Sequence, residues 1–137
     1  MLNSAYTFGT RLPLPWQEAR PLVEAALKAE GFGVLTEIDV AATLLAKLGI
    51  EQAPYLILGA CNPSLAHRAL QADPSIGALL PCNVVLRDDA GQTIVEAMDP
   101  RVVMGLVENP EVAAVAAEAE ERLRRVIASL GPDPSGT

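Results

Sequence analysis

Basic residues are scarce in this chain, and the few that it has are scattered. Of its 137 residues, 10 are Lys or Arg and 17 are Asp or Glu, which gives a net charge of −7 at pH 7. Affinity for a nucleic-acid backbone comes from clustered Lys and Arg side chains. The only basic cluster is Arg122, Arg124 and Arg125, and acidic residues flank it. The composition therefore argues against nucleic acid as a partner.

Long apolar runs are also missing. No stretch approaches the roughly 18 to 20 apolar residues that a membrane span needs. The N-terminus lacks the basic segment followed by an apolar one that marks a secretion signal. Cys61 and Cys82 are 21 positions apart with no CxxC spacing, so they do not indicate a secreted disulfide scaffold. We expect a cytoplasmic protein with reduced cysteines and no membrane partner.

The remaining composition is that of an ordinary globular protein. Half of the residues (50%) are apolar and a fifth (20%) are charged, which is not the composition of a disordered chain. The length fits one domain with a single core. We expect residues 1–131 to form one domain that ends in a long helix, and residues 132–137 to form a disordered tail.

Apolar spacing predicts five strands and several helices. The expected strands span residues 2–12, 32–38, 55–60, 83–86 and 92–97. The expected helices span residues 16–30, 40–48, 63–72 and 110–130, with a short segment at 99–106. These helices do not alternate regularly with the strands, and residues 87–91 favour a hairpin turn. The pattern predicts an α+β fold, with a mainly antiparallel sheet of about five strands and helices packed on one face.

The C-terminal segment at residues 110–130 has the clearest helical pattern. Its apolar residues recur at three- and four-residue steps and form one stripe. The stripe consists of Val112, Val115, Ala119, Leu123, Val126 and Leu130. It belongs either to the core of the chain or to a dimer interface, and the sequence leaves both interpretations open.

Cys61 is the leading candidate for a functional residue. It directly precedes Asn62, the expected N-cap of the helix that begins at Pro63. The free N–H groups at a helix start favour a thiolate over a thiol. A residue before an N-cap also packs as a hydrophobic staple, and free cysteine is often buried. Cys82, at the start of an apolar strand, has the same structural alternative.

Asn62, Asn83 and His67 complete the set of candidate ligand-binding residues. Both asparagines suit backbone hydrogen bonds as cap and turn residues, so ligand contact is a secondary role. His67 and the two cysteines give at most three metal ligands, one fewer than a closed structural zinc site. A Cys–His–Asn hydrolase lacks any local signature here, and dinucleotide, P-loop and serine-hydrolase motifs are absent. We assign no catalytic residue and no cofactor.

Two motifs carry a family resemblance. The chain reads GACNP at residues 59–63 and LLPCN at residues 79–83. Together with residues 32–40, these motifs resemble the prokaryotic family called domain of unknown function 302, from the first strand to about Met104. The resemblance implies a small α+β fold of the TATA-binding-protein-like type, and commonly a homodimer. It implies no activity, and it places the two motif cysteines at Cys61 and Cys82.

Three functions remain open. The first is a non-catalytic module that binds a small ligand, a metal or a sulfur species around Cys61 and Cys82, which requires the two sulfurs to share one cleft. The second is a thiol-dependent enzyme or sulfur-transfer protein, which requires an exposed Cys61 with a lowered pKa. The third is a purely structural or interaction homodimer that uses the stripe at residues 112–130.

Overall fold

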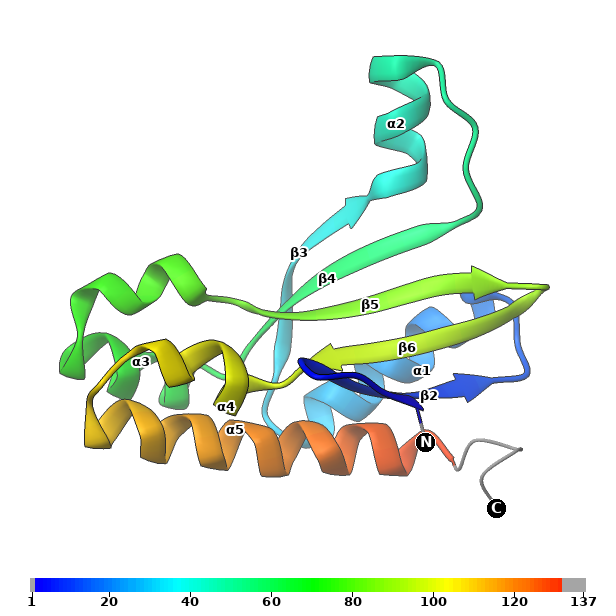
Figure 1. The fold of residues 1–137 in the computed structure, drawn as a ribbon. Helices are drawn as coiled ribbons and strands as arrows, with labels where there is room; N and C mark the ends of the chain where they lie inside the picture. Colours follow the sequence, from blue (N-terminus) through cyan, green and yellow to red (C-terminus); the bar gives the residue numbers. More distant parts are fainter. Residues whose placement is uncertain (1, 132–137) are drawn as a thin grey trace.

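The strands found in residues 2–131, which are the residues that this computed structural model describes, join one antiparallel sheet (Figure 1). Their order across the sheet is β1-β2-β6-β5-β4-β3. The strands are β1 (Leu2–Asn3), β2 (Thr7–Leu12), β3 (Gly33–Asp39), β4 (Tyr55–Cys61), β5 (Cys82–Asp89) and β6 (Gln92–Met98). The predicted α+β fold with an antiparallel sheet is confirmed.

The sixth strand arises because the segment expected as one strand at residues 2–12 is split by a turn. The Ser4 hydroxyl accepts a hydrogen bond from the Thr7 N–H at 3.0 Å, and the Ser4 N–H donates to the Thr7 carbonyl at 2.9 Å. Serine favours such turns because its side chain bonds to nearby backbone. The short strand β1 then folds back antiparallel on β2.

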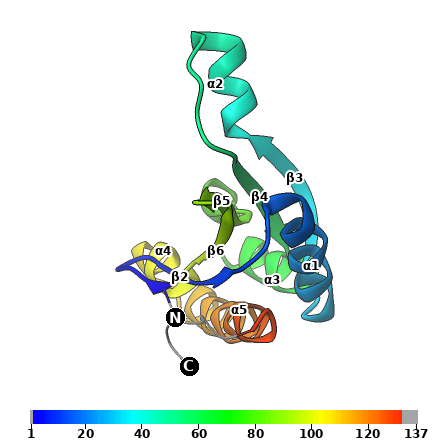
Figure 2. The ribbon, with the colours of Figure 1, turned by 90° about the vertical axis from the view of Figure 1, so that its right-hand side faces the viewer.

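Three long helices lie on one side of the sheet, and a fourth stands apart. The helices are α1 (Trp16–Ala29), α2 (Val40–Leu48), α3 (Pro63–Ala72), α4 (Pro100–Val103) and α5 (Pro110–Ser129), with 3₁₀ turns η1 (Pro74–Leu79) and η2 (Met104–Leu106). Figures 1 and 2 show α2 projecting from the far ends of β3 and β4, away from the other helices. None of these helices is long and apolar enough to cross a membrane, within residues 2–131.

Two apolar clusters form the core. The first lies between the sheet and helices α1 and α5, where Leu58, Val84 and Leu123 are fully or almost fully buried. The second lies beyond the end of the sheet, between α3, η1, η2 and the first half of α5. Each cluster is built from side chains on one face of its strands and helices.

The stripe predicted on α5 belongs to these two clusters. Val112, Val115, Ala119, Leu123 and Val126 are all buried within the chain, and Leu130 packs against the first cluster. The interpretation of this stripe as a dimer interface is therefore wrong, because the sheet, α1, α3 and the 3₁₀ turns already cover it. The tail expected at residues 132–137 lies outside the described residues.

The helix starts follow from the capping residues. The side chains of Asp39, Asn62 and Asn109 each accept a hydrogen bond from a backbone N–H in the first turn of α2, α3 and α5, respectively. Such caps satisfy donors that have no partner inside the helix. The predicted starts of all three helices are confirmed.

Candidate functional site

Both cysteines line one pocket at the end of the sheet. Strands β4 and β5 pair antiparallel, which sets Ala60 opposite Cys82. The Cys82 residue is 5% exposed and belongs to the core between the sheet and the helices. Cys61 follows Ala60 as the last residue of β4 and is partly buried. Neither cysteine forms a disulfide.

The pocket is small and its lining is almost entirely apolar. Its walls come from the ends of β4 and β5, from α3, from η2 and from α5, and include Leu65, Ala69, Leu80, Met104 and Val115. Its volume is about 20 Å³, which is close to the space that one water molecule occupies. The pocket therefore has room for about one heavy atom.

Burial sets the protonation of both thiols. It raises the pKa of the Cys82 thiol to about 11, and the nearby Cys61 contributes a smaller increase. Burial also raises the pKa of the Cys61 thiol, since loss of water disfavours the charged form. This direction is opposite to the one that a helix start favours, and it agrees with the alternative interpretation of Cys61 as a buried structural residue.

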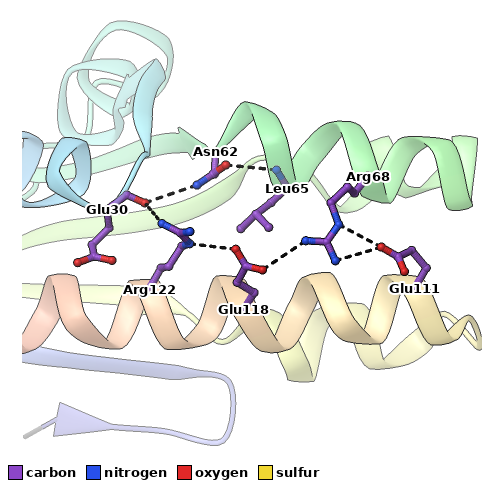
Figure 3. A network of polar contacts seen from close by, with 7 residues as sticks. All are labelled: Glu30, Asn62, Leu65, Arg68, Glu111, Glu118 and Arg122. Carbon is purple, nitrogen blue, oxygen red and sulfur yellow. Dashed lines mark hydrogen bonds and ion pairs between the residues drawn. The ribbon is translucent and has the colours of Figure 1, made fainter.

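Asn62 joins the start of α3 to the end of α1 (Figure 3). Its Oδ1 accepts from the Leu65 N–H at 3.2 Å, and its Nδ2 donates to the Glu30 carbonyl at 3.5 Å. Gly31 ends α1 with a φ of +85°, and a Cβ there would lie 2.8 Å from Asn62 Nδ2. Position 31 thus requires glycine for two reasons: its positive φ, and the close approach of the Asn62 side chain to its Cα.

A network of ion pairs and hydrogen bonds joins α3, α5 and the end of α1 (Figure 3). Arg122 donates to the Glu30 carbonyl at 3.2 Å and to Glu118 at 3.2 Å. Arg68 bridges Glu118 at 3.3 Å and Glu111 at 3.1 Å. These groups are exposed or partly exposed, so water and salt weaken each pair. Their main effect is to hold α3 against α5, above Leu65.

Within this network of ion pairs, only the Glu118–Arg122 pair was predictable from the sequence. The spacing of Glu118 and Arg122 indicates an i, i+4 pair, and that pair is present. The same spacing predicts Glu120–Arg124 and Glu121–Arg125 pairs. The first is present, whereas Arg125 pairs with Glu30, the C-cap residue of α1. The contacts of Arg68 join α3 to α5, and no local pattern reveals partners that are more than forty positions apart.

The other two candidate residues lie away from the pocket. Asn83 is exposed on β5 opposite Gly59, and His67 is exposed on α3; neither lines the pocket. Within residues 2–131, no three His, Cys, Asp or Glu side chains gather where they would hold a metal ion. The structure therefore brings together Cys61, Asn62 and Cys82, and does not add His67 or Asn83 to them.

Met104 is a pocket residue that the sequence analysis did not single out. It is 3% exposed and belongs to the second apolar cluster. The connection from α4 into η2 carries it to the pocket wall formed by α3 and α5. An apolar residue in a short irregular segment gives no local signal of such a place.

Gly59 allows close packing beside the cysteines. It lies on β4 opposite Asn83, and a Cβ there would overlap the Thr36 hydroxyl and approach the Pro81 ring at 2.8 Å. Any side chain at this position would push β3 or the segment before Cys82 outward. The glycine of the GACNP motif thus sets the spacing around the pocket.

The fold and the pocket define a class: small α+β proteins with an antiparallel sheet and two Cys–Asn motifs at neighbouring strand ends. The sequence matches the family "Domain of unknown function DUF302" over residues 8–130. The chain belongs to this family, and the match includes α5, which lay beyond the resemblance seen in the sequence.

A solved structure supports the same assignment. The crystal structure of an uncharacterized conserved DUF302 protein from Bacillus stearothermophilus has a TM-score of 0.86 to this chain at 29% identity. The likeness covers 93% of this chain and 100% of that one. A comparison with curated proteins gave no match.

Proposed function

We propose that this chain is a non-catalytic binding module whose site is the pocket lined by Cys61 and Cys82. The observation that carries the proposal is that the only two thiols of the sequence line one small, mainly apolar pocket. Free cysteines are often simple core residues. Two of them at one pocket, from motifs more than twenty positions apart, are harder to attribute to packing alone.

The pocket limits the chemistry of its ligand. A volume of about 20 Å³ admits roughly one heavy atom. Asn62 is the pocket-lining residue with side-chain nitrogen and oxygen, and its amide already caps α3 and bonds to the Glu30 carbonyl. We therefore assign ligand contact to the sulfur atoms of the pocket wall. Such donors favour a single soft atom or ion.

A thiol enzyme is the weaker alternative. An attacking cysteine acts as a thiolate, which requires a lowered pKa and access to substrate. Burial raises the pKa of Cys61 instead. His67, the only histidine of the chain, is exposed on α3 and does not line the pocket. A proton acceptor for Cys61 is thus missing from the pocket-lining residues.

Mercuric ion is a suitable probe of the proposed site, because two thiolates bind it together far more strongly than one. We expect native mass spectrometry to find one Hg²⁺ per chain that survives excess glutathione. Cys61→Ser and Cys82→Ser are each expected to lose this retention while remaining folded by circular dichroism. Retention that persists in both single variants, or none in the unaltered chain, would contradict a shared site.

A second proposal concerns assembly: the chain forms a homodimer through the arm made of β3, α2 and the segment leading to β4. No residue of α2 is buried, and Ile38, Leu45 and Leu48 expose about half or more of their surface. A nine-residue helix is shorter than the roughly 12 to 15 residues that an isolated helix needs. A partner that covers it would stabilise it.

The sheet edge supports the same proposal. Strand β3 is the last strand of the sheet, so one of its edges faces no other strand of residues 2–131. Such an edge readily pairs with a second copy. The arm also forms one side of a groove of about 420 Å³ lined by Trp16, Leu45, Tyr55 and others. We place the dimer in the cytoplasm, where reducing conditions keep thiols free.

Sedimentation velocity tests the dimer. The double variant Leu45→Asp/Leu48→Asp is expected to sediment as a monomer at concentrations where the unaltered chain is a dimer. Leu106→Asp is the matched control, because Leu106 is 81% exposed but lies in η2, far along the chain from the arm. A dimer that survives the arm variant, or an unaltered chain that is monomeric, would rule out this interface.

A further inference from the structure

We propose that the pocket binds one cuprous ion, held by the thiolates of Cys61 and Cys82 and the thioether of Met104. This inference rests on the binding function proposed above and names its ligand. The three sulfur residues all line the same pocket. Two of them, Cys82 and Met104, are buried, so an ion between them would be shielded from water.

The donor set selects the metal. Thiolate and thioether sulfurs are soft ligands that favour Cu⁺, whereas Mg²⁺ and Ca²⁺ require oxygen donors. Asn62 supplies the only side-chain nitrogen and oxygen on the pocket wall, and both atoms already bond to backbone groups. A structural zinc site needs four protein ligands. Within residues 2–131, not even three His, Cys, Asp or Glu side chains gather at one place.

The size of the pocket agrees with a single bare ion. Its volume of about 20 Å³ holds about one heavy atom, and the apolar walls of Leu65, Ala69 and Val115 would exclude a hydration shell. Three sulfur ligands that surround the ion replace that shell. A strongly hydrated ion such as Mg²⁺ dehydrates reluctantly and does not fit.

Binding of Cu⁺ requires no oxidant or reductant. Each cysteine thiol releases one proton to solvent, and each resulting thiolate donates an electron pair to Cu⁺. The Met104 thioether donates a third pair and loses no proton. Copper stays in the +1 state throughout. Affinity is therefore expected to rise with pH, as it does for thiolate metal sites in general.

The test is an anaerobic titration with Cu⁺ against the colorimetric chelator bicinchoninate. We expect one tightly bound ion per unaltered chain, and at least about tenfold weaker binding for Met104→Leu, the range that perturbation of a metal's supporting shell already produces. Leucine and methionine are similar in volume, so this variant remains folded. Met98→Leu is the matched control, because Met98 packs against the core but does not line the pocket; its affinity is expected to be unchanged.

The outcomes separate this inference from the function on which it rests. Equal Cu⁺ affinities for Met104→Leu and Met98→Leu, or no competition with the chelator, would overturn the three-sulfur site. If Hg²⁺ is still retained by the two cysteines in that case, the binding module stands and only the copper assignment fails. If the unaltered chain binds neither Hg²⁺ nor Cu⁺, both the binding module and the copper site are overturned.

Discussion

The two ends of strand β4 lie in opposite environments. At Cys61 the strand ends among buried side chains of α3, α5 and η2, which line the sulfur pocket. At Tyr55 it begins beside the α2 arm, whose helix buries no residue. The strand itself is apolar along its whole length, so the composition of β4 does not explain the difference.

The difference comes from what each end is connected to. Helix α5 runs along the sheet and continues past its end, where α3 packs against it and Arg68 bridges the two helices. Helix α2 instead joins β3 to β4 at the outer edge of the sheet and projects away from the other helices (Figures 1 and 2). Similar apolar content thus forms a small pocket at one end and an exposed surface at the other. The pocket end suits a small ligand, and the exposed end suits a protein partner.

Truncating one leucine in the packed body and one on the α2 arm should give the largest difference in the free energy of unfolding. Leu58 is fully buried and Leu48 is 65% exposed. Leu58→Ala is expected to lower the free energy of unfolding by about 2 to 5 kcal/mol through lost burial and a cavity. Leu48→Ala is expected to change it by less than about 0.5 kcal/mol. Urea unfolding of dilute protein measures both, and equal losses would show that the arm is packed after all.

High pH should weaken the metal-free sulfur end. The pKa of Cys82 rises from its ordinary value of 9.0 to about 11 on folding. Below pH 9 the thiol is protonated in both states. Between pH 9 and 11 only the unfolded chain loses the proton, so the free energy of unfolding falls as pH rises. The full loss is about 2 to 3 kcal/mol, at about 1.4 kcal/mol for each unit of pKa difference.

Urea unfolding at pH 8 and pH 11 measures this loss. The Cys82→Ala variant provides the baseline, because tyrosines and lysines also titrate in this range. Between pH 8 and pH 11, the free energy of unfolding should fall more in the unaltered chain than in Cys82→Ala, by about 2 to 3 kcal/mol. Identical pH dependences would mean that Cys82 is not buried as described.

Removing the cap of α3 or of α2, the helices at the two ends of β4, should lower stability less than Leu58→Ala or high pH does. The two losses should also differ in kind. Asn62→Ala removes the cap of α3 and the bond to the Glu30 carbonyl, and is expected to lower global stability by about 1 kcal/mol. Asp39→Ala removes the cap of α2 and is expected to speed hydrogen exchange within α2 only, because a weakly packed unit opens locally. A global loss from Asp39→Ala would contradict the separation of arm and body.

The ion pairs that join α3 to α5 should give the smallest effect. Arg68→Ala removes both of its contacts with α5, yet these groups are partly exposed. We expect a small decrease in the melting temperature at low salt, and this decrease should shrink at high ionic strength as the charges are screened. Thermal unfolding at two salt concentrations measures this. A larger, salt-independent loss would indicate a packing role for the side chain.

The local parts of this structure were predictable, and the long-range parts were not. Asp39, Asn62 and Asn109 mark helix starts because a cap depends only on its nearest neighbours. The separation of α2 from the core was not visible, since its apolar residues suggest burial. Met104 and Arg68 reach their partners through the packing of distant elements, which no spacing in the sequence encodes. The sequence left both interpretations of Cys61 open because a helix start is visible in it and burial, which raises the pKa, is not.

Anomalous diffraction at the copper edge, from crystals of the Cu⁺-loaded protein, tests the central claim most directly. The account predicts one strong peak per chain, at bonding distance from the sulfurs of Cys61, Cys82 and Met104. A peak at His67 or at surface carboxylates, with the pocket empty, would contradict it.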